Sequence, residues 1–340
     1  MPCMSDFYEL LEVQPRASQA VIQAAFRALM KDHHPDSNET AGRIAVKLNE
    51  AYAVLSDPKK RAEYDRKREN IAGRVIGGFR IDEAIAEGGF GKTYKGTHVL
   101  VGEPVCIKHC NRISAADTAI LLEEAKAMWD LRHFAIPAVR NMLKLDDGSV
   151  ALVMSYVPGP TLQEVIESYA DKNQKLEPED IAWITERILN VLSYMHRHGV
   201  VHGDLKPGNI IIQPESHTVV LVDFGLAAIK PTRTTGSKGY TDLFAPPEQV
   251  RGSPLIPQTD FYSLGMTVLY ALSGGDASKA AAKRVPETVP DPMCEFISRL
   301  LVRDPLARPD WMAENLMETH HKMRVRSFGR ANSGMKPLAL

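Results

Sequence analysis

The sequence predicts two units of unequal size: a small all-helical unit, followed by a larger α+β unit with two lobes. Three observations support this. The chain has 340 residues, which corresponds to about two domains of ordinary size. Apolar residues recur at helical spacing within residues 5–68. From residue 79 onward, runs rich in β-forming residues come first and amphipathic helices follow, which is the order expected of an α+β fold.

The helical unit is predicted from two apolar stripes, one over residues 21–30 and one over residues 44–55. Pro35 lies between them and ends the first helix, because proline cannot donate a backbone hydrogen bond. Asp57 and Pro58 are typical of an N-cap followed by the first helical residue, so a further helix is expected from there. Two antiparallel helices joined by a loop would bury the two stripes against each other.

The larger unit begins with strands and ends with helices. Strand-like runs punctuated by glycine and proline cover residues 79–87, 91–99, 104–109, 139–145 and 150–157, and a helix is expected over 114–131. The later part carries long apolar helical stripes at residues 181–195 and 260–272, with a short β pair at 210–213 and 219–222. Between the units, residues 69–78 are expected to form a linker. Residues 320–340 are expected to form a mobile tail, because this segment has several cations and no acid.

Overall charge and cysteine usage exclude several classes of protein. Lys+Arg is 41 and Asp+Glu is 42, and this balance argues against a dedicated nucleic-acid binder and against polybasic membrane docking. The four cysteines form no CxxC pair, so unrelated thiols in a reducing compartment are expected rather than a metal site. No basic-then-apolar leader and no membrane-length apolar run is seen, so a cytoplasmic protein with no membrane span is expected.

A glycine-rich segment suggests phosphate binding. Residues 85–94 read IAEGGFGKTY between two predicted strands. Glycines let backbone amides approach a phosphate closely, although an ordinary tight turn would have the same composition. Lys108 ends the next apolar strand, where an inward-facing ammonium needs a counter-charge or a phosphate. Glu123 or Glu124 on the following helix could supply that counter-charge.

The segments that follow add the remaining chemistry of phosphoryl transfer. Residues 201–209 read VHGDLKPGN and residues 222–225 read VDFG. Together they offer an acceptor for a hydroxyl proton, a cation for the transferred phosphoryl group, and oxygen ligands for a hard cation. Residues 245–248 read APPE, and residues 304–309 read DPLARP.

This ordered series resembles the eukaryotic-type serine/threonine protein kinase family over residues 79–319. The resemblance implies a bilobal fold, ATP and Mg²⁺ as cofactors, and transfer of the ATP γ-phosphate to protein Ser/Thr hydroxyls. Lys206, two residues after Asp204, is typical of the serine/threonine branch.

The resemblance assigns roles to individual residues. It implies ATP contacts at Ile85, Gly88, Gly91, Thr93, Cys106, Lys108, Met154 and Val157. Catalytic roles fall on Asp204, Lys206, Lys108 and Glu124, the last being preferred over Glu123. Metal ligation falls on Asn209 and Asp223, and the pocket for the substrate hydroxyl on Ser237. A structural ion pair is implied for Glu248 and Arg308, and a buried helix anchor for Asp260.

Two positions depart from the family pattern. Ala86 replaces the first glycine of the phosphate loop. Gly203 replaces the arginine that normally precedes the catalytic aspartate and pairs with a phosphate on the activation loop. The hypothesis that follows is a kinase that is constitutively competent or gated by a partner. Its activity should then depend little on phosphorylation at Thr232, Thr234, Thr235 or Ser237.

The helical unit resembles the J domain of DnaJ co-chaperones over residues 5–68, through the segments DFYELLEV at 6–13, LNEAYAVLSDP at 48–58 and RAEYD at 61–65. The family's functional tripeptide maps onto His34, Pro35 and Asp36, which implies a DnaK-type chaperone as partner. The preceding helix offers only Arg27 and Lys31 as cations, so a J fold retained for dimerisation or docking stays an alternative.

The leading hypothesis is therefore a serine/threonine protein kinase with an N-terminal J domain that recruits or stimulates a DnaK-type chaperone. One alternative is a co-chaperone whose kinase fold is an inactive scaffold or client-binding module. Against it, Lys108, Asp204 and Asp223 are all present. A second alternative is a kinase of small molecules. Against that one stands the APPE segment, which in the family builds a peptide-binding surface.

Overall fold

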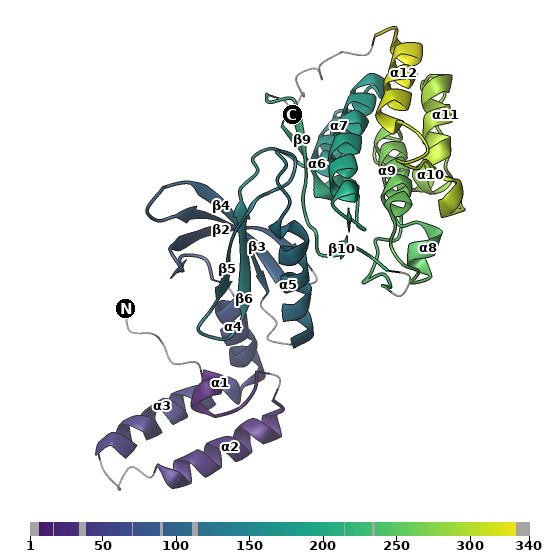
Figure 1. Cartoon of the computed structure of the whole chain (residues 1–340). Coiled ribbons are helices and arrows are strands. Elements are labelled where there is room, and N and C mark those ends of the chain that lie inside the picture. Colours follow the sequence, from purple (N-terminus) through teal and green to yellow (C-terminus); the bar gives the residue numbers. More distant parts are fainter. Residues whose placement is uncertain are drawn as a thin grey trace.

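The computed structural model describes residues 7–15, 17–33, 39–69, 71–88, 91–110, 115–213, 215–232 and 235–330. A helical N-terminal region comes first, a lobe built on a β-sheet follows, and a helical lobe comes last (Figure 1). This order confirms the predicted fold class of an all-α unit followed by a bilobal α+β unit.

The N-terminal region contains four helices: α1 (Phe7–Leu10), α2 (Gln19–Asp32), α3 (Glu39–Leu55) and α4 (Pro58–Glu69). Helices α2 and α3 lie side by side, and the two apolar stripes meet between them (Figure 1). Ile22 of α2 is fully buried against Leu48 and Leu55 of α3. The rings of Phe26 and Tyr52 stack with centroids 4.1 Å apart.

Helix α4 belongs to this region despite its density of charged residues. Arg61 donates to the Tyr8 hydroxyl at 3.0 Å and to the carbonyls of Pro15 and Ala17, each at 2.8 Å. The Tyr8 hydroxyl in turn donates to Asp65 at 2.7 Å. Burial and the nearby carboxylate of Asp65 raise the pKa of Tyr8 to about 12. These polar contacts therefore join α4 to the start of the chain.

Part of the segment expected to form a linker, residues 71–76, packs on the β-sheet lobe. Ile71 is fully buried in the outer core, by which we mean the apolar cluster on one face of the β-sheet lobe. Strand β1 (Val75–Ile76) pairs antiparallel with strand β2 (Phe79–Gly88), and the Gly73 amide donates to Ile81 O at 2.7 Å. A single isoleucine forms no periodic pattern, so the sequence does not predict its burial. The burial is seen only in the structure, where Ile71 packs on one face of the sheet.

The sheet of the first lobe has the strand order β1-β2-β3-β4-β6-β5, and every pair is antiparallel. The remaining strands are β3 (Gly91–His98), β4 (Pro104–Cys110), β5 (Val139–Lys144) and β6 (Val150–Ser155). Successive residues of a strand face opposite sides of a sheet. Val105 and Ile107 therefore enter the outer core with Ile71, while Cys106 and Lys108 face helix α5 (Ala115–Trp129), which packs on the other side.

The second lobe is mainly helical. Its helices are α6 (Leu162–Asp171), α7 (Pro178–Arg197), α8 (Pro247–Val250), α9 (Pro257–Leu272), α10 (Ala277–Ala281), α11 (Asp291–Leu300) and α12 (Leu316–Phe328). Its short strands are β7 (Val200–Val201), β8 (Ile210–Gln213), β9 (Thr218–Leu221) and β10 (Ala228–Ile229), and β8 and β9 form the β pair expected from the sequence. Helix α9 is buried along nearly all its length, which explains its largely apolar sequence.

The prediction of a mobile tail from residue 320 was wrong for residues 320–330. Helix α12 continues to Phe328 and packs on α7 and α11 (Figure 1). Arg324 is 2% exposed and forms an ion pair with Glu186 of α7. Arg324, one of the cations that suggested a solvated tail, is therefore buried inside the helical lobe. Residues 331–340 lie outside the described residues.

His320 of α12 predicts a loss of stability in acid. The side chain is fully buried, and burial together with the positive charge of Arg324 lowers its pKa to about 3. Below the ordinary histidine pKa of about 6.5, the unfolded chain binds a proton that the folded chain does not, so stability falls as pH decreases. We expect the free energy of unfolding to drop by about 2 kcal/mol between pH 8 and pH 5 because of this residue alone.

Urea denaturation of the wild-type chain and of His320→Leu at both pH values would measure this contribution. The substituted chain should lose about 2 kcal/mol less than the wild type over that pH range. Equal losses in the two chains would contradict the assignment to His320.

Across the described parts of the chain, no helix combines the length and the apolar character needed to cross a membrane.

Candidate active site

The glycine-rich segment forms the hairpin between β2 and β3, where Gly88 pairs with Gly91. Gly91 has a φ of +144°, and a Cβ added there would lie 2.0 Å from the carbonyl oxygen of His109 on β4. Only glycine fits this close approach of two backbones. Gly89 and Phe90 lie outside the described residues.

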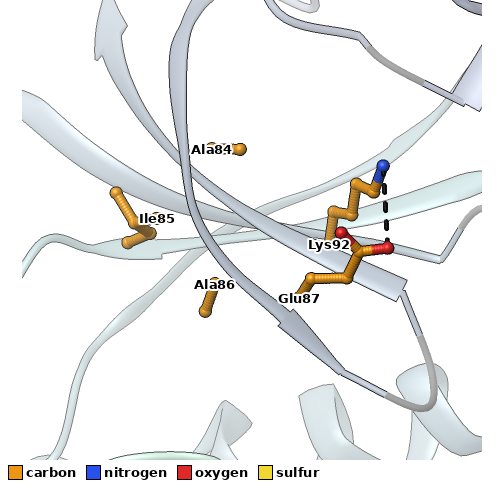
Figure 2. Close-up of a pocket in the computed structure, with 5 residues that line it drawn as sticks. All are labelled: Ala84, Ile85, Ala86, Glu87 and Lys92. Carbon is orange, nitrogen blue, oxygen red and sulfur yellow. Dashed lines mark ion pairs between the residues drawn. The ribbon is translucent and has the colours of Figure 1, made fainter.

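A pocket lies along this hairpin, lined by Ala84, Ile85, Ala86, Glu87 and Lys92 (Figure 2). Lys92 forms an ion pair with Glu87 at 3.7 Å, which ties β3 to β2 beside the turn. Among the residues predicted to contact ATP, Ile85 lines this pocket, and its side chain is largely exposed.

The register of the sheet brings together other residues predicted to contact ATP. Thr93 lies opposite Lys108, and Cys106 lies opposite Met154. Because directly opposed residues share a face, these four side chains lie on the face that also carries α5. Val157 follows the end of β6 in the segment that leads to α6. Burial raises the pKa of the Cys106 thiol to about 11, so this cysteine packs as an apolar group and is not a reactive nucleophile.

Lys108 joins three elements. Its ammonium contacts both carboxylate oxygens of Glu124 on α5, at 2.7 and 2.9 Å, and Asp223 Oδ1 at 2.6 Å. Burial alone would lower the pKa of Lys108, but the two carboxylates outweigh it and raise the pKa, so the group stays charged.

The neighbouring acid on α5 behaves differently. Glu123 is exposed and pairs with Lys126 at 2.7 Å, so Glu124 and not Glu123 contacts Lys108. Glu124 Oε1 also accepts from the Phe224 amide at 3.3 Å. Helix α5 therefore contacts the DFG segment, residues 223–225, as well as strand β4.

A buried carboxylate on helix α9 holds the loop that carries Asp204. Asp260 of α9 is fully buried and accepts from the amides of His202 at 2.8 Å and Gly203 at 2.9 Å. His196 Nε2 lies 2.8 Å from the same carboxylate, and the Trp311 indole donates to His196 Nδ1 at 2.8 Å. Because an indole N–H can only donate, His196 carries its proton on Nε2 and donates it to Asp260.

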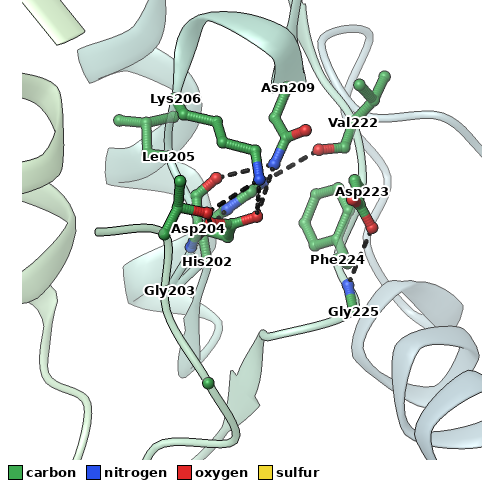
Figure 3. Close-up of polar contacts among 12 residues, drawn as sticks. His202, Gly203, Asp204, Leu205, Lys206, Asn209, Val222, Asp223, Phe224 and Gly225 are labelled. Carbon is green, nitrogen blue, oxygen red and sulfur yellow. Dashed lines mark hydrogen bonds and ion pairs between the residues drawn. The ribbon is translucent and has the colours of Figure 1, made fainter. Parts of the chain in front are cut away.

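Polar groups converge on Asp204 itself (Figure 3). Lys206 Nζ and Asn209 Nδ2 donate to Oδ2, at 2.7 and 3.0 Å. The Thr241 hydroxyl donates to Oδ1 at 2.7 Å and accepts from Lys206 at 3.0 Å. Asp204 is only 8% exposed, so this network fixes the direction of its carboxylate.

The structure places Thr241, and not Ser237, against the Asp204 carboxylate. The Ser237 hydroxyl donates to Gly239 O at 2.7 Å. This is a local contact within the activation segment, the stretch between the DFG residues 223–225 and the APPE residues 245–248. Ser237 follows a glycine, as the family pattern requires, whereas Thr241 follows Tyr240. Only the path of the folded segment shows which hydroxyl reaches Asp204.

Asn209 and Asp223 have the donor atoms that a magnesium ion requires. Asn209 uses Nδ2 for its contacts with Asp204, at 2.8 Å to the carbonyl and 3.0 Å to Oδ2, which leaves the Oδ1 atom for a metal. The Asp223 side chain is 45% exposed, and its backbone has a φ of +63°. The next residue, Phe224, is fully buried with its ring 4.9 Å from that of His202. Carboxylate and amide oxygens suit Mg²⁺ shared with phosphate groups.

Glu248 and Arg308 form a buried bidentate ion pair, with nitrogen–oxygen distances of 2.5 and 2.9 Å. It joins α8, at the end of the activation segment, to the segment after α11. Arg308 also lies over the Tyr262 ring, with its Cζ 4.9 Å from the ring centroid.

A two-lobed fold whose Lys108–Glu124 pair joins β4 to α5 beside an aspartate loop defines the class of protein kinases. Comparison with known families agrees with this. The chain belongs to the protein kinase family, whose sequence model matches residues 79–321, and a DnaJ domain model matches residues 6–65. Protein kinases use ATP and typically Mg²⁺. His34, Pro35 and Asp36 of the DnaJ domain lie outside the described residues.

Three of the similar curated proteins are bacterial serine/threonine-protein kinases. PkaA of Streptomyces coelicolor is 35% identical over 238 residues, which are 63% of this chain and 42% of PkaA. PknL of Mycobacterium tuberculosis is 30% identical over 252 residues, which are 68% of this chain and 62% of PknL. Pkn3 of Myxococcus xanthus is 30% identical over 263 residues, which are 68% of this chain and 47% of that protein. The chain thus spans roughly half the length of these relatives.

Proposed function

We propose that this chain is an ATP-dependent serine/threonine protein kinase whose DnaJ domain engages a DnaK-type chaperone. The observation that carries the kinase proposal is the double ion pair of Lys108 with Glu124 and Asp223. It joins the sheet, helix α5 and the DFG segment around one ammonium. The same ammonium is the group that the family uses to hold the α- and β-phosphates.

Each side chain then has a distinct task. ATP bound with Mg²⁺ would supply the phosphoryl group, and Asn209 and Asp223 would hold the metal. Asp204 orients the substrate hydroxyl and accepts its proton, because Lys206, Asn209 and Thr241 fix the carboxylate's direction. Lys206 lies 2.7 Å from Asp204, where its positive charge stabilises charge that develops on the transferred group.

The DnaJ domain supports the second part of the proposal. Arg27 and Lys31 are exposed on α2 and are four residues apart, so they share one face of the helix just before the His-Pro-Asp tripeptide. A cationic face of this kind would attract an acidic surface of a chaperone. The thiols of Cys106 and Cys294, which form no disulfide within the described residues, support a cytoplasmic location, which we also propose.

One purified preparation of the full chain, assayed twice, tests both parts. In the first assay, labelled ATP with Mg²⁺ and a mixed protein extract should give phosphoserine and phosphothreonine on hydrolysis of the labelled proteins. In the second, the chain should stimulate ATP hydrolysis by a DnaK-type chaperone, and Asp36→Asn should remove that stimulation.

The two assays fail independently. Label found only on small molecules, or no label at all, would overturn the protein kinase proposal. Equal chaperone stimulation by the wild type and Asp36→Asn would overturn the chaperone proposal, because the tripeptide is the part of the J domain that makes the contact.

A further inference from the structure

The peptide in front of Asp204 has no room for a side chain. Gly203 has a φ of +74°, and a Cβ there would lie 2.8 Å from Leu255 Cδ1 and 2.9 Å from the Leu226 carbonyl oxygen. Both the backbone conformation and the surrounding atoms therefore exclude an arginine at this position. The chain cannot align its activation segment with an arginine–phosphate pair at residue 203, so another group must connect the two segments.

Gln249 makes that connection. It lies on α8, is 1% exposed, and its Nε2 donates to Gly203 O at 2.7 Å and to Gly239 O at 2.9 Å. Both acceptors are carbonyl oxygens, so only the amide nitrogen can face them and the orientation of the side chain is determined. One buried amide thus joins the residue before Asp204 to the activation segment two residues before Thr241.

The same peptide is held from its other side, since the Gly203 amide donates to Asp260 at 2.9 Å. The activation segment has further internal anchors that require no phosphate. Lys238 Nζ donates to Ala227 O at 2.9 Å, and the Lys230 amide donates to Gly199 O at 2.6 Å. Among the described residues, Gly203, Lys230 and Lys238 are therefore held by hydrogen bonds within the chain that need no phosphate.

We propose that Gln249 is a positioning residue that holds the Asp204 loop and the activation segment in the catalytic arrangement without a phosphate on that segment. This inference rests on the proposed kinase function. Loss of the two amide hydrogen bonds would let Gly203 and Gly239 separate. Small displacements at a catalytic group are costly, on the order of 10²-fold in rate for about 1 Å.

The test compares Gln249→Leu with a matched substitution elsewhere. Gln249→Leu should lower kcat by about ten-fold or more while KM for ATP changes by no more than about two-fold, because Lys108 and its partners are untouched. Gln258→Leu is the control: Gln258 is 8% exposed, and its Nε2 donates to Asp310 at 2.8 Å, away from the Asp204 loop. It should cost stability but leave kcat unchanged.

Two further variants separate positioning from general destabilisation. Gln249→Glu places a carboxylate against two carbonyl oxygens at pH 8, whereas the protonated acid can donate one hydrogen bond. Its kcat relative to the wild type should therefore rise as pH is lowered from 8 to 6. Alanine at Thr232, Thr234 and Thr235 together should leave the wild-type kcat unchanged.

A readout that needs no catalysis completes the test. Trypsin should cleave after Lys238 faster in Gln249→Leu than in the wild type or Gln258→Leu. A wild-type kcat or unchanged cleavage in folded Gln249→Leu would overturn the proposal, as would loss of activity in the folded three-alanine variant. Failure of the kinase function itself would appear separately, as a wild-type chain that transfers no phosphate but still shows the cleavage difference.

Discussion

Asp204→Asn is expected to reduce kcat by about 10²–10⁴-fold, the usual contribution of a positioned proton acceptor. Asparagine has nearly the same shape but cannot accept the hydroxyl proton. Its amide nitrogen would also face the donors that now reach the carboxylate from Lys206, Asn209 or Thr241. KM for ATP should stay nearly unchanged, because the Lys108 ion pairs with Glu124 and Asp223 do not involve Asp204.

The measurement is phosphotransfer to a protein substrate together with binding of a fluorescent ATP analogue in the presence of Mg²⁺. Asp171→Asn is the matched control, since it makes the same chemical change at an exposed residue at the end of α6. Asp204→Asn with wild-type kcat would show that another group accepts the proton.

Arg308→Met is expected to destabilise the helical lobe by about 3–5 kcal/mol, the cost of leaving a buried charge without its partner. The Arg308 side chain is fully buried, and that of Glu248 is 9% exposed. Arg308 also donates to the carbonyls of Val302 at 2.7 Å, Gln258 at 2.9 Å and Arg303 at 3.2 Å. Methionine would fill part of the space but would leave one carboxylate and three carbonyls without these donors.

Urea denaturation of the full chain would measure this loss, with Arg299→Met as control. Arg299 pairs with Glu314 at 2.5 Å, but its side chain is 47% exposed, so removing it should cost only about 0–1 kcal/mol. Adding Glu248→Met to Arg308→Met should recover part of the stability, because the unpaired charge is then gone. Equal losses for Arg299→Met and Arg308→Met would contradict a special role for the buried pair.

The parts of the site that the sequence predicts well are those that local patterns specify. Lys108 is in the inward-facing set of β4 because it alternates with Val105 and Ile107, which face the outer core. Asp204, Lys206 and Asn209 lie in one short loop, so their spacing alone brings them near each other. To choose Glu124 over Glu123, one must know which side of the helix faces the sheet. The family resemblance, and not the local pattern, identified Glu124 as the residue on that side.

The residues that sequence reasoning missed act across long chain separations. Thr241 reaches Asp204 across 37 residues, and Gln249 reaches Gly203 across 46. Ile71 and Arg324 have no local pattern that marks them as buried, since Ile71 stands among polar and small neighbours and Arg324 carries a charge. Their surroundings come from other elements, namely the outer face of the sheet for Ile71 and helix α7 for Arg324.

By itself, the sequence determined that the chain contains a helical J-type unit and a kinase unit, and it predicts which short segments carry the phosphate chemistry. Hydrophobic periodicity and motif spacing are local properties, so they survive without a three-dimensional structure. Only the tertiary structure showed that Thr241 contacts Asp204, that Gln249 joins the Asp204 loop to the activation segment, and that Ile71 and helix α12 pack on the two lobes. These contacts depend on which surfaces meet after folding, and the spacing of residues along the chain does not contain that information.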